Sequence, residues 1–169
     1  RTRGDQRLFA SQIGLDCNRN IGFQPLRFAL IRTDNMATGL ADYDENTFVL
    51  SEALGGKITS MDVEAGVVCK EYVLGNAYRT LEGRVNVGII ASLIDDTVGE
   101  VVPAQTKNQM YSAIIDMTIS YIRPLFIGRV TVEARTVSIG KTIGHLEARV
   151  FDENGKLASR ATVTASIRA

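Results

Sequence analysis

Polar and apolar residues alternate strictly in four runs along the second half of the chain. An alternation of period two is typical of strands whose sheet has one buried and one solvent-facing side. We expect four residues of the first run, residues 113–122, on its buried side: Ile115, Met117, Ile119 and Tyr121. The same pattern predicts three further strands, at residues 129–137, 145–151 and 157–167.

Short turn-forming segments separate these runs. Asn154-Gly155 is a dipeptide that favours a tight hairpin, and Gly140 marks the turn before it. Such short connections favour antiparallel neighbours over parallel ones. Two more strands are expected earlier in the chain, at residues 57–63 and 66–74.

A helical pattern lies between these two sets of strands, at residues 82–99. Apolar residues recur there at spacings of three and four, namely Val85, Ile89, Ile90, Leu93, Ile94 and Val98. A helix that is apolar on nearly all sides must be buried against a large surface. The order of elements therefore predicts an α+β domain, in which a curved antiparallel sheet of five to six strands wraps around one long central helix.

The length of 169 residues suits a single domain. Residues 1–56 contain too few apolar side chains for a core of their own, so we expect an N-terminal extension docked on a domain of residues 57–169. The opening "RTRGDQRLFASQIG" is rich in Arg and nearly free of acidic residues. It fits either the remnant of an organelle-targeting region or a solvated terminus. The expected location is accordingly the mitochondrial matrix, or otherwise the cytoplasm.

Charge and composition argue against several classes of protein. The chain has 19 basic and 19 acidic residues, whereas nucleic-acid-binding domains usually carry a basic face, so no nucleic-acid partner is expected. No apolar run approaches 18 residues, so no membrane span is expected. Cys17 and Cys69 match no metal-ligand spacing, and we expect two buried free thiols and no metal site.

Several short words follow one another in the last third of the chain: "YIRP", "GRVTV", "GKT" and "DENGKLAS". In this order and spacing they resemble the hotdog-fold acyl-CoA thioesterases, in particular the phenylacetate-pathway type and its human mitochondrial relatives. The resemblance covers residues 57–167 and implies a hotdog fold that works as a homodimer or a dimer of dimers. It also implies hydrolysis of a fatty or aryl acyl-CoA without a cofactor, since coenzyme A is part of the substrate.

Such enzymes carry an H-G-G turn at the start of the central helix, whose backbone N–H groups donate to the thioester carbonyl. A carboxylate nine residues after the His acts as nucleophile or as base for water. Two registers compete here. In the first, Asn76 matches an Asn that orients water or the thioester, and Glu82 replaces the His. In the second, Asn86 replaces the His, Gly88 keeps one glycine, and Asp95 is the acid. The two registers are compatible with each other if this chain has about four more residues than the family at this point, close to one helical turn.

The resemblance implies further substrate contacts outside the helix. Ser112 would substitute for the Ser or Thr that the family places on the following strand. The loop that contacts coenzyme A in relatives corresponds to Gly140, Lys141 and Thr142, and Lys141 would pair with a phosphate. Two more cations, expected near the same end of the domain as this loop, are candidates for phosphate binding: Arg123 and Arg129.

The departures from the family pattern leave a second hypothesis open. Neither register contains the His, and one glycine is lost. The chain would then be a catalytically inactive hotdog protein that serves, with protein partners, as a structural subunit of a larger mitochondrial complex. The N-terminal extension offers contact surface, and hotdog units already pair edge to edge. Asp96, which points about 100° away from Asp95, is expected to be a solvated residue on the polar flank of the helix, with a carboxylate role in catalysis as the alternative.

Overall fold

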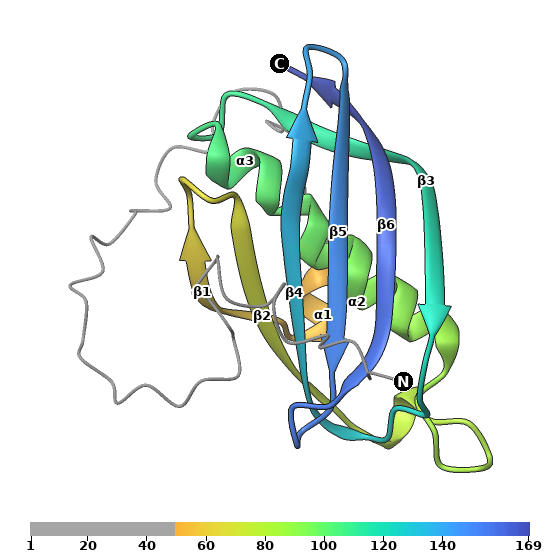
Figure 1. The fold of residues 1–169 in the computed structure, drawn as a ribbon. Helices are drawn as coiled ribbons and strands as arrows, with labels where there is room; N and C mark the ends of the chain where they lie inside the picture. The colour runs from red at the N-terminus through yellow and green to blue at the C-terminus, as the bar shows by residue number, and fades with distance from the viewer. Residues whose placement is uncertain (1–49) are drawn as a thin grey trace, which may run out of the picture.

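The computed structural model describes residues 50–169, and Figure 1 shows the arrangement of their elements. The helices are α1 (Leu50–Leu54), the 3-10 helix η1 (Asn76–Tyr78), α2 (Val87–Gly99) and α3 (Val101–Gln105). The strands are β1 (Lys57–Asp62), β2 (Val67–Leu74), β3 (Tyr111–Tyr121), β4 (Gly128–Ile139), β5 (Ile143–Phe151) and β6 (Leu157–Arg168). The predicted order of two strands, a long helix and four strands is confirmed.

The six strands form one antiparallel sheet in the order β1-β2-β4-β5-β6-β3. The sheet curves around α2, which crosses one of its sides (Figure 1). β1 and β3 are therefore the two edge strands. The fold prediction, a curved antiparallel sheet around a central apolar helix, is confirmed.

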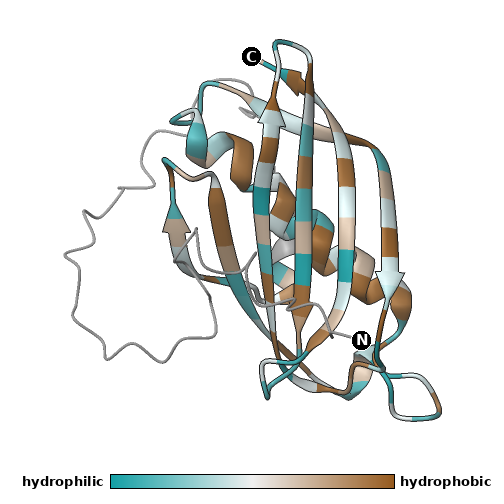
Figure 2. Cartoon of the chain, viewed as in Figure 1, coloured by the Kyte–Doolittle hydropathy of each residue, from teal (hydrophilic) through white to brown (hydrophobic). Residues whose placement is uncertain are grey.

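The core lies between α2 and the sheet. The helix contributes Ile90, Leu93, Ile94, Thr97 and Val98 to it, all buried. The predicted inward rows of β4, β5 and β6 are buried as well: Val130, Val132 and Ala134, then Leu146, Ala148 and Val150, then Ala161, Val163, Ala165 and Ile167. Figure 2 shows the result as alternating apolar and polar bands along these strands.

The predicted buried side of β3 is partly wrong. A β-bulge just after Ile114 shifts the pairing of β3 with β6 and reverses the alternation of sides. Ile114 consequently packs against the core, whereas Ile115 is 59% exposed. Met117 and Ile119 pack against the core as expected, but Tyr121 is 47% exposed. One extra residue in a strand leaves no mark in an apolar pattern, so this error could not be read from the sequence.

The central helix begins later than predicted. α2 starts at Val87 with Asn86 as its N-cap, so residues 82–86 precede the helix. Val85 is buried, as its spacing suggested. It is not helical, however, and forms an isolated antiparallel bridge with Arg79. α3, which follows α2 directly, is missing from the sequence prediction.

Cys69 on β2 is buried as expected, but it is disulfide-bonded, so the prediction of a free thiol is wrong for this residue. Cys17, the other cysteine of the sequence, lies outside the described residues. Part of the predicted extension does belong to the described structure: Leu54 is buried in the core, and the Tyr78 hydroxyl donates to the Ala53 carbonyl at 2.9 Å. The boundary at residue 56 stays a prediction.

Candidate functional site at the start of the central helix

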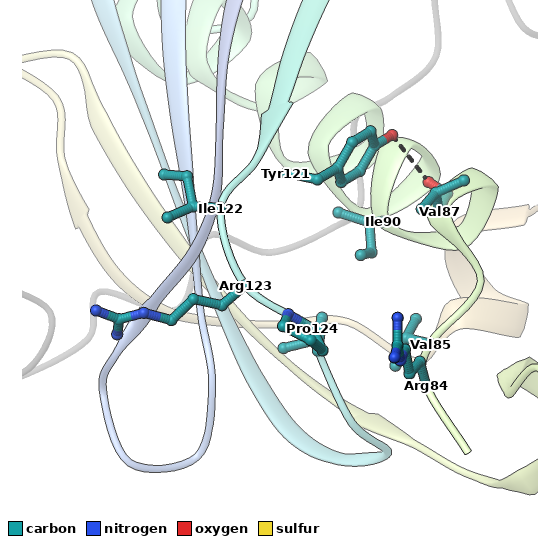
Figure 3. A pocket seen from close by; sticks show the side chains of 9 residues that line it. Arg84, Val85, Val87, Ile90, Tyr121, Ile122, Arg123 and Pro124 are labelled. Carbon is teal, nitrogen blue, oxygen red and sulfur yellow. Dashed lines mark hydrogen bonds between the residues drawn. The ribbon is translucent and has the colours of Figure 1, made fainter. Parts of the chain in front are cut away.

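A pocket of about 260 Å³ lies beside the N-terminus of α2, between the helix and the connection from β3 to β4 (Figure 3). Val85, Ile90 and Leu125 give it apolar walls. Arg84 and Arg123 are its charged lining residues, and Figure 3 shows Arg123 extending away from the helix. An apolar cavity with a few polar groups at its rim is the usual form of a small-molecule site.

Tyr121, the last residue of β3, contacts the first turn of α2. Its hydroxyl donates to the Val87 carbonyl at 3.2 Å (Figure 3). The bond places the helix N-terminus at the C-terminal end of β3. Since α3 contacts β3 and β4 after α2 has ended, α2 runs roughly opposite to β3.

Asn86 caps the helix with its own side chain. Its Oδ1 accepts the Gly88 N–H at 2.8 Å, and its carbonyl accepts the Ile89 N–H at 3.0 Å. This is the normal way to satisfy the free N–H groups of a first helical turn. The Gly88 N–H, the donor that would polarise a thioester carbonyl, is therefore engaged by the protein itself.

Residues 79–85 form a tight turn in front of the helix. The Thr80 N–H donates to the Arg84 carbonyl at 2.7 Å, and the Gly83 N–H donates to the Thr80 carbonyl at 3.0 Å. Gly83 has a φ of +80°, a backbone conformation that favours glycine. Residues 79–85 therefore precede α2 as a turn and do not form an added turn of the helix.

The start of α2 distinguishes the two sequence registers geometrically. Asn86, the N-cap, and Gly88 stand at the helix N-terminus, and Asp95 follows Asn86 by nine residues on the same helix. Glu82 instead lies exposed in the preceding turn. Asn76 is also exposed and begins η1, where its carbonyl accepts the Arg79 N–H at 3.4 Å. Only the second register brings its candidate residues to the helix start.

Asp95 and Asp96 point to different flanks of α2, because each helical residue is rotated by about 100° from the one before. Val87 marks the flank that faces β3, through its bond with Tyr121. Asp95, eight residues on, lies about 80° from Val87, whereas Asp96 lies on the opposite flank. Asp95 is exposed in the single subunit. The pKa of the Asp95 carboxyl is raised, mainly by partial burial and to a lesser extent by the negative charge of Asp96.

Asp96 is not solvated, so that prediction is wrong. Its side chain is only 10% exposed, and Lys70 Nζ lies 2.7 Å from its Oδ2. The Tyr72 hydroxyl donates to the same oxygen at 2.7 Å. Both partners lie on β2, so this flank of α2 is bonded to the sheet. The paired aspartates thus have separate surroundings, and only Asp95 is available to a ligand.

The remaining predicted residues do not gather in one place within a single subunit. Ser112, near the start of β3, is half-buried on the same side of the strand as Ile114. Arg129 points to the outer side of the sheet and pairs with Glu71 at 3.4 Å. Arg123 alone among the predicted cations lines the pocket.

The predicted coenzyme A loop lies at the far end of the sheet from the pocket. Gly140, Lys141 and Thr142 connect β4 to β5, and the Gly140 N–H donates to the Ile143 carbonyl at 2.8 Å. β4 is 12 residues long, so its two ends are roughly 35 Å apart at about 3.3 Å per residue. The expectation that Arg123 and Arg129 lie near this loop is wrong within one subunit, because they stand at the opposite end of β4.

Three residues of this region were not predicted as site residues from the sequence: Arg84, Tyr121 and Lys70. Lys70 had a readable signal, because it has the inward parity of Val68 and Tyr72 in the run "VVCKEYVL". A charged residue at an inward strand position requires a buried partner. Arg84 had no readable signal, since the turn that places it is not visible in the pattern. Tyr121 was predicted on the same side of the strand as Met117 and Ile119, but its bond to α2 was not.

Within residues 50–169, no group of three or more His, Cys, Asp or Glu is placed to hold a metal ion. In that same part of the chain, no helix has the length and apolar character needed to cross a membrane.

Comparison with known proteins identifies relatives of this domain. A sequence model of the thioesterase superfamily matches residues 82–159. A phenylacetic acid degradation-related protein of Ralstonia eutropha JMP134 is similar in structure, with a TM-score of 0.66 and 26% identity, over 72% of this chain and 93% of that one. No curated protein sequence matches the chain.

Two further solved structures have the same architecture. A conserved protein of Pseudomonas aeruginosa has a TM-score of 0.65 and 25% identity, over 72% of this chain and 95% of that one. The E. coli PaaI protein from the phenylacetic acid degradation operon has a TM-score of 0.65 and 21% identity, over 71% and 84% of the two chains. The described domain therefore has the hotdog fold of these structures, and the match to the thioesterase superfamily over residues 82–159 supports a thioester-hydrolase-like function.

Proposed function

We propose that the protein hydrolyses fatty or aryl acyl-CoA thioesters, with Asp95 as the general base at the interface of two copies. The placement of Asp95 is the observation that supports this most. It follows the N-cap of α2 by nine residues, and helical rotation places it about 80° from Val87, nearer to the β3 side of the helix than Asp96 is. Within one subunit the pocket lies at the helix N-terminus, away from Asp95, so a complete site requires a second copy.

The outer edge of β3 suits pairing with that copy. β3 is 11 residues long, and among residues 50–169 its one neighbouring strand is β6. Tyr111, Ile115 and Tyr121 expose 51%, 59% and 47% of their surface along it. A long apolar edge strand is a template for pairing with another chain. We expect two copies to join antiparallel through β3 about a twofold axis.

Such a pair would assemble the site from both subunits. In an antiparallel β3 pair, Tyr121 of one copy comes close to the partner's Tyr111. Because α2 runs opposite to β3, the helix N-terminus of one copy then approaches the part of the partner's helix that bears Asp95. The partner's Lys141 lies at the same end of the pair as the pocket. The coenzyme A phosphates would there meet Lys141 of the partner subunit and Arg123.

The reaction follows from these positions. Asp95 removes a proton from a water molecule, and the water oxygen bonds to the thioester carbonyl carbon. The carbon–sulfur bond then breaks, and the sulfur leaves with the proton that Asp95 returns. Backbone N–H groups of the first turn of α2 stabilise the negative charge on the carbonyl oxygen. A raised pKa makes the Asp95 carboxylate a stronger base at neutral pH.

The Asn86 cap must move for this donor set to be complete, because its Oδ1 occupies the Gly88 N–H. The thioester carbonyl would replace the Asn86 oxygen at Gly88. Asn86 thus stands at the family's His position as a cap that competes with the substrate. Slow turnover is expected for this reason.

The test is hydrolysis of a panel of fatty and aryl acyl-CoAs, followed by release of free thiol. Turnover should fall by about 10²–10⁴-fold in Asp95→Asn, the usual contribution of a general base. Glu153→Gln, an exposed carboxylate in the β5–β6 turn, is the matched control and should keep full activity. Equal rates in the wild type and Asp95→Asn would contradict the role of Asp95.

One observation favours a second function, that of an inactive structural subunit. The engaged Gly88 N–H removes the best oxyanion donor, as expected of a site no longer used in catalysis. Wild-type protein with no turnover on any acyl-CoA, together with stable co-purification with a large mitochondrial complex, would favour this function over hydrolysis.

A further inference from the structure

A buried polar cluster lies between α2 and β2, on the side of the helix away from the pocket. Lys70 lies on the inward side of β2 and is only 3% exposed, although its side chain is charged. Its Nζ is 2.7 Å from Asp96 Oδ2 and 3.6 Å from Glu100 Oε1. Both carboxylates belong to α2 or its C-cap. The proposed hydrolysis makes no use of these groups.

Tyr72 completes the cluster from the same strand. Its hydroxyl oxygen lies 2.7 Å from Asp96 Oδ2, 2.8 Å from Thr97 Oγ1 and 3.3 Å from the Leu93 carbonyl. Burial, first, and the neighbouring Asp96 carboxylate raise the pKa of Tyr72, so the hydroxyl stays protonated and can donate. β2 therefore holds α2 through Leu93, Asp96 and Thr97, which share one flank of the helix.

These contacts fix the rotation of α2 about its own axis. A purely apolar interface leaves a helix free to choose among several packings of similar energy, whereas a buried charge must meet its partner. If α2 were rotated by one residue, about 100°, Asp95 would meet Lys70 and Asp96 would leave the cluster. The clamp made by Lys70 and Tyr72 on Asp96 thus selects which aspartate faces β3.

The cluster also supplies the charges that act on Asp95. The inward rows of β4, β5 and β6 are apolar. β3 turns Ser112, Ile114, Met117 and Ile119 toward the helix, and its Asp116 is exposed. β2 brings Lys70 and Tyr72, and the end of α2 brings Glu100. Asp96 is the neighbouring charge that raises the pKa of Asp95, and Lys70 compensates that charge.

We propose that Lys70, Tyr72 and Asp96 are positioning residues for Asp95. They hold α2 so that Asp95 faces β3 and the partner copy, and Lys70 offsets the negative charge that Asp96 places beside it. This inference deepens the proposed hydrolytic function and rests on it for its biological meaning. The arrangement itself is measurable without turnover.

The test measures the titration of Asp95 by carbon-13 NMR in the intact protein, beside the pH dependence of kcat. Asp96→Asn removes the neighbouring charge, so the Asp95 midpoint should move to lower pH. Lys70→Met removes the cation that lies 2.7 Å from Asp96, so the midpoint should move to higher pH. Lys156→Met, an exposed Lys in the β5–β6 turn, is the control and should change nothing. A role limited to stability would not shift the midpoint in opposite directions.

The acidic limb of the pH profile of kcat should shift in the same directions as the Asp95 midpoint. It should move to lower pH in Asp96→Asn and to higher pH in Lys70→Met. A loss of kcat on the order of 100-fold is expected in Lys70→Met, since small displacements of a reacting group have effects of this size. If Lys70→Met fails to fold, Asp96→Asn and the double variant Lys70→Met/Asp96→Asn, which has neither charge, provide the comparison. Both should show the lowered midpoint.

The outcomes separate the two proposals. An Asp95 midpoint unchanged in Asp96→Asn overturns the inference, whether or not the protein hydrolyses thioesters. Opposite shifts without turnover in the wild type would support the clamp and contradict the hydrolytic function.

Discussion

The two flanks of α2 differ sharply, although both carry an aspartate. On the β2 flank, Asp96 is 10% exposed and is bonded by Lys70 and Tyr72. On the other side, Asp95 is exposed and lies nearer to β3, which is an edge strand of the sheet formed by residues 50–169. The Asp96 flank is bonded to the sheet of the same subunit, and we propose that the Asp95 flank is completed by a second copy. The comparison shows that adjacent, chemically identical residues take different roles because a helix turns them toward different neighbours.

Removal of Lys70 tests the bonded flank and should have the largest effect on stability. Lys70→Met removes one partner of a buried ion pair, and the free energy of unfolding should fall by about 3–5 kcal/mol. Urea unfolding followed by circular dichroism measures it. Replacing both partners, in Lys70→Met/Asp96→Leu, should restore most of the loss, because an apolar pair needs no compensation. Equal losses in the single and double variants would contradict the buried-pair interpretation.

A charge on β3 tests the open flank. Ile115→Lys places two cations close together near the centre of the expected β3 pair, so the dimer dissociation constant should rise about tenfold or more, equivalent to about 1.4 kcal/mol. Sedimentation velocity measures the change. Ile58→Lys, a similar substitution on the other edge strand, β1, is the matched control, since Ile58 is also exposed. Dissociation caused by Ile58→Lys instead would place the interface at β1.

Asn86, the N-cap, lies at the start of α2, and its substitution should affect stability less than the loss of Lys70 does. Asn86→Ala removes the acceptor of the Gly88 N–H and should cost about 1 kcal/mol of stability, whereas Asn86→Gly should cost only a few tenths. Asn86→Gly also frees the Gly88 N–H, so thioester turnover should rise relative to the wild type. Thermal unfolding and the acyl-CoA assay check the two effects. Lower turnover in Asn86→Gly would show that the Asn86 side chain itself assists the reaction.

The pH dependence of Asp95 should give the smallest change. Its pKa is raised in the folded state, so the folded protein binds the proton more tightly than the unfolded chain does. Stability should therefore fall as pH rises from the ordinary aspartate pKa through the raised value, and stay lower above it. Asp95→Asn should remove this fall. A comparison of unfolding free energies of wild type and variant across the acidic range measures it.

Some of the site could be predicted from sequence. Asp95 was selected by its spacing from Asn86, and the structure places Asn86 at the helix start. The partner of Asp96 could have been found, because Lys70 breaks an apolar strand at an inward position. The turn at residues 79–85 could not, because a four-residue insertion reads equally well as an added helical turn or as a loop.

The sequence by itself determined the fold, because periods of two and 3.6 bury one side of each element whatever the surroundings. It also determined the sharp hairpin at Asn154-Gly155, whose Gly155 has a φ of +71°. Only the tertiary structure decided the bulge that exposes Ile115, the start of α2 and the flank assigned to each aspartate. These depend on contacts between residues far apart in the chain, such as Lys70 with Asp96 and Tyr121 with Val87. A local pattern carries no information about which distant side chain will occupy the facing position.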